Sequence, residues 1–236
     1  TLAVNYECRY GYCGSCSVEV NGEPTLACRA PALKSMVITP LSNVPILRDL
    51  VVDHKAIMDS LVRIRPFLER RRPLEKEPEE LRPVDFSTFR IVSRCISCLC
   101  CVSKCPSFTE AKHLYAGPNL IAEVARLAFD PRDGGDRLRT AYEEGLFNCA
   151  MCGKCTEVCP YDIDIPKLIM MPMRRMTLER NIGPVKEVED LTGLVKMTGK
   201  SLIKPPKATF LSKAPSVVRV KKPRDQVSLF LGCLFD

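Results

Sequence analysis

Two cysteine runs with identical spacing restrict the possible folds of this chain more than any other feature. Each run places three cysteines at two-residue gaps, adds a fourth cysteine three residues later, and ends with proline. This is the spacing of bacterial ferredoxins, in which three cysteines hold one 4Fe–4S cluster and the fourth reaches a neighbouring cluster. The runs are Cys95-x2-Cys98-x2-Cys101-x3-Cys105-Pro106 and Cys149-x2-Cys152-x2-Cys155-x3-Cys159-Pro160.

The repeated spacing predicts that the two runs exchange their fourth ligands. Two zinc knuckles are the alternative, but they would leave one cysteine of each run unused. The first predicted 4Fe–4S cluster is bound by Cys95, Cys98, Cys101 and Cys159. The second is bound by Cys149, Cys152, Cys155 and Cys105.

Another cysteine group lies near the start of the chain. Its spacing, Cys8-x4-Cys13-x2-Cys16 followed by Cys28, is that of plant-type 2Fe–2S ferredoxins. Gly11 and Gly14 supply the unusual backbone angles that a loop wrapped around a cluster needs. A zinc site is the alternative, but zinc favours paired CxxC units.

Two of the 14 cysteines lie outside these groups, at Cys100 and Cys233. We expect Cys100 to be a small buried apolar residue. Clustered cysteines separated by long cysteine-free stretches argue against a disulfide framework, which staples distant segments together. The pattern therefore favours ligand groups in a reducing cytoplasm.

The remaining sequence predicts an α+β protein: a plant-type 2Fe–2S ferredoxin domain of the β-grasp type, followed by an all-α, bacterial-ferredoxin-like domain with two 4Fe–4S clusters. Because no initiator Met is present and an apolar strand pattern stands near the last residue, we expect truncation at both ends. The predicted segments are 1–40 (partial 2Fe–2S domain), 41–89 (helix and linker), 90–180 (helical domain), 181–226 (basic linker) and 227–236 (start of a truncated domain).

Local patterns predict several elements. A strand at 17–20, the turn Asn21-Gly22 and a return strand at 26–28 form a hairpin. An amphipathic helix is expected over 43–64, with Asn43 as its N-cap, and an unpacked extended linker over 70–83.

Later helices are expected around the apolar stripe 120–128, after the break at Gly134-Gly135, from Pro166 with Asp164 as N-cap, and near 185–197. Pro172 should interrupt the helix that starts at Pro166.

Several function classes are excluded by composition and motifs. The net charge is +7, yet no interleaving of aromatic and basic residues supports nucleic-acid binding. No apolar run approaches the roughly 18 residues that cross a bilayer. The chain has no P-loop, dinucleotide fingerprint or Ser/His/Asp set, so no catalytic residue is predicted and no substrate site is complete in it.

The order of a 2Fe–2S group, a linker and two ferredoxin-type runs resembles the iron–sulfur subunit of the succinate dehydrogenase/fumarate reductase family. Residues 40–53 are similar to the family's segment after the 2Fe–2S domain, and 95–101 to its first four-iron run, including the extra Cys100. Gly117-Pro118 and 130–133 are also similar. The resemblance covers roughly residues 1–180 and implies a partner flavoprotein subunit that contains FAD.

Quinone-linked members of that family lack a cysteine at the position of Cys152 and hold a 3Fe–4S cluster there. They also carry a Trp after the first run and a His at the position of Ala150, whereas this chain has no Trp. The comparison implies a complete 4Fe–4S cluster at the last run and favours an electron donor other than a quinol.

Residues 229–234 resemble the opening of the Cys-Cys-Gly (CCG) domain of heterodisulfide reductases. An iron–sulfur subunit that continues into such a domain is similar in layout to that of the methanogen thiol:fumarate reductases, which take electrons from the coenzyme M and coenzyme B thiols. Cys233 would then be a ligand of a further cluster.

The resemblance therefore implies an electron-transfer subunit of a cytoplasmic fumarate reductase that forms succinate, without a membrane span. A quinone-linked subunit, with a membrane anchor as an additional partner, is the alternative, and a zinc protein without a redox role is the third hypothesis.

Overall fold

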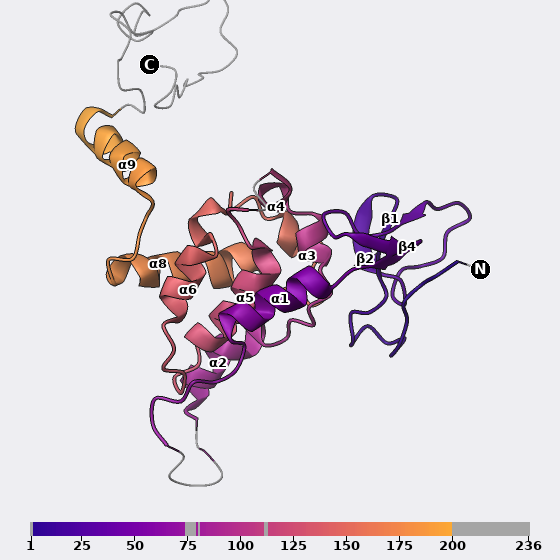
Figure 1. Cartoon of the computed structure of the whole chain (residues 1–236), viewed down its shortest axis with the longest axis horizontal. Coiled ribbons are helices and arrows are strands. Elements are labelled where there is room, and N and C mark those ends of the chain that lie inside the picture. The colour runs from indigo at the N-terminus through magenta and orange to yellow at the C-terminus, as the bar shows by residue number, and fades with distance from the viewer. Residues whose placement is uncertain (1, 74–78, 80, 111–112, 200–236) are drawn as a thin grey trace, which may run out of the picture. The chain divides into compact units, whose positions relative to one another are not determined.

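The computed structural model describes residues 2–73, 79, 81–110 and 113–199, and the chain divides into two units, Thr1–Ile182 and Gly183–Asp236. Strands β1–β5 and helices α1–α8 belong to the first unit, and helix α9 (Lys186–Thr198) belongs to the second (Figure 1). The helix predicted near 185–197 is therefore confirmed. The predictions for 200–226 and 227–236, including Cys233, lie outside the described residues.

A small antiparallel sheet carries part of the first cysteine group. Strand β1 (Ser17–Val20) pairs with β2 (Glu23–Leu26) on one side and with β3 (Ile38–Thr39) on the other. Asn21 and Gly22 both have positive φ angles, 53° and 81°, as the predicted two-residue hairpin turn requires. The prediction of a return strand at 26–28 was wrong. The return strand is β2, which starts at Glu23 because a two-residue turn lets the pairing begin directly after Gly22.

The predicted helix over 43–64 is correct only in its second half. Helix α1 (Lys55–Ile64) is preceded by a hairpin of β4 (Ile46–Arg48) and β5 (Val51–Val52). Asn43 is not an N-cap: it has a φ of 65°, and its side-chain amide donates to the carbonyls of Val102 and Ser103, both at 3.1 Å. The apolar spacing of 46–52 fits a helix face as well as a hairpin, and these long-range contacts select the hairpin.

Four helices besides α1 build the core of the helical region (Figure 1). They are α2 (Pro83–Val92), α5 (Gly117–Ala128), α6 (Arg137–Glu143) and α8 (Met171–Glu179). Helix α5 packs against α1, α2 and α6, and its predicted apolar stripe is buried, with Ile121 fully inaccessible. The break at Gly134-Gly135 is confirmed, and α6 ends before Gly145, whose φ is 83°.

The cysteine runs lie on loops that lead into short helices. These are α3 (Cys100–Ser103), α4 (Pro106–Glu110), η1 (Leu146–Asn148), α7 (Lys154–Glu157) and η2 (Pro166–Met170). The carboxylate of Asp164 accepts from the N–H of Lys167 at 3.1 Å, which caps the start of η2. Segment η2 is a π-helical turn that continues into α8 next to Pro172, so the interruption predicted there is confirmed.

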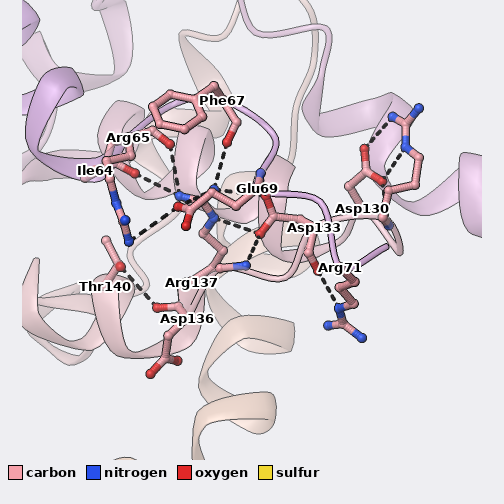
Figure 2. A network of polar contacts seen from close by, with 12 residues as sticks. Ile64, Arg65, Phe67, Glu69, Arg71, Asp130, Asp133, Asp136, Arg137 and Thr140 are labelled. Atoms are coloured by element: carbon pink, nitrogen blue, oxygen red, sulfur yellow. Dashed lines mark hydrogen bonds and ion pairs between the residues drawn. The ribbon is translucent and has the colours of Figure 1, made fainter. Parts of the chain in front are cut away.

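The segment after α1 is fastened to the loop between α5 and α6 by one buried side chain, Arg137 (Figure 2). Its guanidinium donates to the carbonyls of Ile64 and Arg65, both at 3.0 Å, and of Phe67 at 2.8 Å. It also donates to both carboxylate oxygens of Asp133, at 3.0 and 2.9 Å.

The start of the predicted linker joins the same network. The N–H of Arg71 donates to the carbonyl of Arg132 at 3.0 Å, and its Nε donates to the carbonyl of Asp133 at 2.6 Å. An unpacked linker from residue 70 was therefore wrong. The side chain of Arg71 is exposed, as the charged composition predicts, but these hydrogen bonds attach the start of the segment to the helical region.

Candidate iron–sulfur sites

The first cysteine loop points several backbone N–H groups at one sulfur. The N–H groups of Tyr10, Tyr12 and Cys13 lie 3.4, 3.3 and 3.4 Å from the sulfur of Cys8. These hydrogen bonds, with that from Tyr10 the strongest, lower the pKa of Cys8 to about 6. The loop therefore favours a thiolate at Cys8, the form that binds iron.

The glycines in this loop explain how the backbone turns. Gly11 and Gly14 have φ angles of 80° and 75°, in the left-handed region where glycine is unstrained. Cys16, further along the loop, is buried, and the N–H of Cys28 lies 3.5 Å from its sulfur. Burial raises the pKa of Cys16, and the neighbouring Cys28 and Cys13 raise it further. All four cysteines of the first predicted group thus gather around one loop.

The four cysteines of the first predicted four-iron group line one cavity. Apolar side chains complete its wall, and the amide nitrogen of Asn119 lies 3.7 Å from the sulfur of Cys95. The cavity combines three cysteines of one run with the last cysteine of the other. They are Cys95, Cys98, Cys101 and Cys159.

Burial controls the electrostatics of this cavity. It raises the pKa of Cys95 to about 11 and holds the pKa of Cys101 well above its usual value. The pKa of Cys98 is also raised, first by its contact with the side chain of Cys100 and then by burial. Such thiols stay neutral at pH 7 unless a cation is close, and iron supplies that positive charge. A cavity lined by four thiols, with Cys98 and Cys101 buried and apolar side chains in its wall, therefore fits an iron–sulfur cluster.

The second predicted four-iron group gathers around the loop before α7. Burial raises the pKa of Cys155 to about 12, and Cys149, Cys105 and Cys152 raise it further. Burial also raises the pKa of Cys105, with added effects of Cys149 and Cys152. The four cysteines are thus close enough to interact, and Cys152 is exposed.

Arg174, on α8, fixes the backbone of this loop. Its guanidinium donates to the carbonyl of Cys149 at 2.7 Å and to that of Leu146 at 3.0 Å. It also lies 5.4 Å from the centre of the Phe147 ring. The sequence did not predict a role for Arg174, because its partners are backbone carbonyls, which leave no pattern in the sequence.

The three cysteine groups adjoin one another. From here on, the first group is that of the 2Fe–2S loop, the second is the group that lines the cavity, and the third is the group around α7. Cys16 of the first group packs with Cys98 of the second and with the fully buried Cys100 between the two loops. The charge of Cys155, in the third group, raises the pKa of Cys101, in the second. The cavity group therefore lies between the 2Fe–2S loop and the group around α7. The expectation that Cys100 is a buried small residue is confirmed.

Further contacts hold the first loop against the second group. The hydroxyl of Tyr161 donates to the carbonyl of Gly11 at 3.2 Å, and Arg29 donates to the carbonyl of Pro160 at 3.1 Å. A Cβ on Gly14 would lie 2.9 Å from the carbonyl oxygen of Ile96. Only a glycine permits this close approach of the two loops.

The described residues hold neither a site for a single metal ion nor a membrane span. In that part of the chain, no three or more His, Cys, Asp or Glu side chains form a group that could hold a single metal ion. None of the helices described there has the length and apolar character that crossing a membrane requires.

Comparisons with known proteins agree with this arrangement. A model of the 2Fe-2S iron-sulfur cluster binding domain matches residues 1–59, and a model of the 4Fe-4S dicluster domain matches 91–163. The chain is 36% identical over 173 residues to the fumarate reductase iron-sulfur subunit of Mycobacterium tuberculosis, a match that covers 70% of each chain. The chain belongs to the iron–sulfur subunits of the fumarate reductase/succinate dehydrogenase family.

Other relatives of this iron–sulfur subunit extend the comparison. It is 34% identical over 235 residues to a subunit of the fumarate reductase (CoM/CoB) of Methanothermobacter marburgensis, across 100% of this chain and 46% of the relative. The chain thus spans about half the length of that relative. A structure described as the Mycobacterium smegmatis Sdh1 complex in the apo form is similar with a TM-score of 0.71 and 32% identity, covering 78% of this chain and 80% of that one. The predicted α+β fold, a 2Fe–2S ferredoxin domain followed by a helical dicluster domain, is confirmed.

Proposed function

We propose that this iron–sulfur subunit conducts electrons to an FAD-containing flavoprotein subunit, which reduces fumarate to succinate in the cytoplasm. The observation that carries the proposal is the serial contact of three four-cysteine groups, through Cys16 and Cys98 at one junction and Cys101 and Cys155 at the other. An iron–sulfur cluster, when bound, supplies one-electron transfer. The protein's part is to hold the groups close together and to keep water away from the middle one.

The proposed ligand sets are those predicted from the spacing. The 2Fe–2S cluster is held by Cys8, Cys13, Cys16 and Cys28. One 4Fe–4S cluster is held by Cys95, Cys98, Cys101 and Cys159, and the common cavity of these four side chains supports this set. The other is held by Cys149, Cys152, Cys155 and Cys105, supported by their mutual influence on pKa.

The proposed electron donors are the thiols of coenzyme M and coenzyme B. Their oxidation to a disulfide releases two electrons and two protons, which balances the reduction of fumarate to succinate. The match of the whole chain to a relative named for these coenzymes supports this choice. The cysteine at position 152, which quinone-linked members lack, also supports it. The exposed Cys152 offers an entry point for electrons at the third group. Cys233 remains a proposed ligand of a further cluster.

The experiment begins with anaerobic purification of the full-length subunit together with its flavoprotein. Iron, acid-labile sulfide and zinc are measured, and spin resonance assigns the cluster types. The complex is then tested for fumarate reduction with the two coenzyme thiols or with a quinol. We expect one 2Fe–2S and two 4Fe–4S signals in the cysteine groups described above, and activity with the thiols. Zinc without sulfide would contradict the redox function.

A quinone-linked subunit is the second candidate, because the Mycobacterium tuberculosis fumarate reductase subunit and the Sdh1 complex are similar to this chain. It predicts a 3Fe–4S signal, activity with a quinol but not with the thiols, and association with a membrane anchor. The cysteine at position 152 argues against a 3Fe–4S cluster at the last run. The same assays therefore separate the two candidates.

A further inference from the structure

The phenol of Tyr115 is buried without a partner next to the third cysteine group. The residue is 1% exposed, and its hydroxyl has no hydrogen-bond partner in the described structure. It packs in one apolar cluster with Cys105, Cys155 and Cys149. A buried hydroxyl without a partner destabilises the folded state, so such groups in folded proteins usually meet an acceptor.

The surroundings of this hydroxyl offer sulfur as the acceptor. The side chains of Cys149 and Cys105 lie close enough to act on this phenol electrostatically. Because an ordinary phenol has a pKa of about 10, the hydroxyl is protonated at neutral pH and keeps a proton to donate. The side chain of Cys149 lies close to this hydroxyl, but the two do not meet the geometry of a hydrogen bond.

The backbone around Tyr115 is fixed on both sides. The next residue, Ala116, donates its N–H to the carbonyl of Glu144 at 3.0 Å, and Asn148 donates to the carbonyl of Leu114 at 2.6 Å. A Cβ on Gly145 would lie 2.9 Å from the Cα of Tyr115. These contacts come from the segment that leads directly into Cys149, so the phenol and the cysteine loop are held as one unit.

We propose that Tyr115 donates an O–H···S hydrogen bond to the 4Fe–4S cluster of the third group, at the Cys149 thiolate or an inorganic sulfide, and thereby raises its reduction potential. The inference rests on the proposed cluster at Cys105, Cys149, Cys152 and Cys155. A reduced cluster carries one more negative charge, and a hydrogen bond to its sulfur stabilises that charge. Tyr115 thus makes this cluster a better electron acceptor than the cysteine ligands alone would make it.

The test is a redox titration of Tyr115→Phe in the anaerobically purified complex, followed by spin resonance. We expect unchanged iron and sulfide content and a loss of about tenfold in the equilibrium constant for reduction of this cluster alone, a downward shift of about 59 mV. Tyr161→Phe is the matched control. It removes a phenol hydroxyl that donates to Gly11, and it should leave the potential of the third group unchanged.

A second measurement does not depend on the variant folding. Incorporating fluorotyrosine throughout the wild-type chain makes the Tyr115 phenol a stronger hydrogen-bond donor, so the reduction potential of this cluster should rise. In Tyr115→Phe, the same incorporation should leave the potential of this cluster unchanged. An unshifted potential in Tyr115→Phe, loss of the cluster from a folded variant, or no response to fluorotyrosine in the wild type would overturn the inference. Absence of this cluster from the wild-type complex would instead overturn the proposed function.

Discussion

Arg137 and Asp133 form a bidentate ion pair with almost no access to solvent. Two N–H groups of the guanidinium reach the two carboxylate oxygens at 3.0 and 2.9 Å, and the side chains are 3% and 2% exposed. The remaining guanidinium donors reach three carbonyls in the segment after α1 (Figure 2). The Arg137 side chain therefore attaches the segment between α1 and α2 to the core of the helical domain.

Replacing Arg137 with lysine should destabilise the first unit by about 3 kcal/mol, because one ammonium cannot satisfy the carboxylate and three buried carbonyls. The measurement is the free energy of unfolding in denaturant. Arg139→Lys is the matched control on the same helix, since Arg139 is 59% exposed and its change should cost about 0.5 kcal/mol or less. Equal losses for the two variants would show that the buried network adds no stability.

The same pair makes stability depend on pH. Burial alone would raise the pKa of Asp133, but hydrogen bonds from Arg137 and from the N–H groups of Glu69 and Gly135 outweigh it, so the pKa is lowered. A lowered folded-state pKa gives stability that is complete above the unfolded value, about 3.9, and is lost as pH falls through the folded-state pKa.

We therefore expect the difference in unfolding free energy between wild type and Asp133→Asn to be constant above about pH 5 and to shrink at lower pH. Chemical denaturation between about pH 7 and pH 3 measures it, with cluster absorbance recorded to show that the clusters persist. A difference that grows on acidification would contradict this sign.

The crossed ligand sets predict that a cysteine substitution damages the cluster of the other run. Cys105→Ser should remove the cluster of the loop at 149–155, and Cys159→Ser should remove that of the loop at 95–101. Spin-resonance spectra are compared with those of Cys152→Ser and Cys98→Ser, which mark the two clusters. If Cys105→Ser matches Cys98→Ser instead, the crossed assignment is wrong. Cys100→Ala is the control and should keep all three clusters.

Gly14 and Gly22 form a natural pair for testing the junction between the first two groups. Both have φ angles near 80°, but a Cβ on Gly14 would lie 2.9 Å from the carbonyl oxygen of Ile96, whereas a Cβ on Gly22 meets nothing within 4 Å. Alanine at Gly22 should cost only about 1 kcal/mol, the backbone penalty.

Alanine at Gly14 has the same backbone strain and must also push the two loops apart, which should lower the free energy of unfolding by a further amount of about 1–3 kcal/mol. We expect it to lower the 2Fe–2S content and to slow reduction of that cluster, as followed by absorbance under anaerobic conditions. Matching behaviour of the two variants would mean that the close approach of the loops has no effect.

The sequence predicted the helices and turns that depend on local signals. The Asn21-Gly22 turn, the stripe on α5 and the capping carboxylate of Asp164 all act within a few residues, so their patterns are visible in the sequence. The stretch from 43 to 54 was mispredicted because its apolar spacing suits two conformations. Asn43 decides between them through a contact with Val102 and Ser103, far along the chain.

The spacing of the cysteines by itself indicated the family and the kind of metal cofactor, because most ligands of a cluster lie at short, fixed spacings in one loop. Only the tertiary structure decided which cysteine groups touch, that Arg137 is buried with Asp133, and that the phenol of Tyr115 is buried without a hydrogen-bond partner. Each of these depends on residues that are distant in the chain meeting in one packed interior, where burial and unpaired polar atoms take effect.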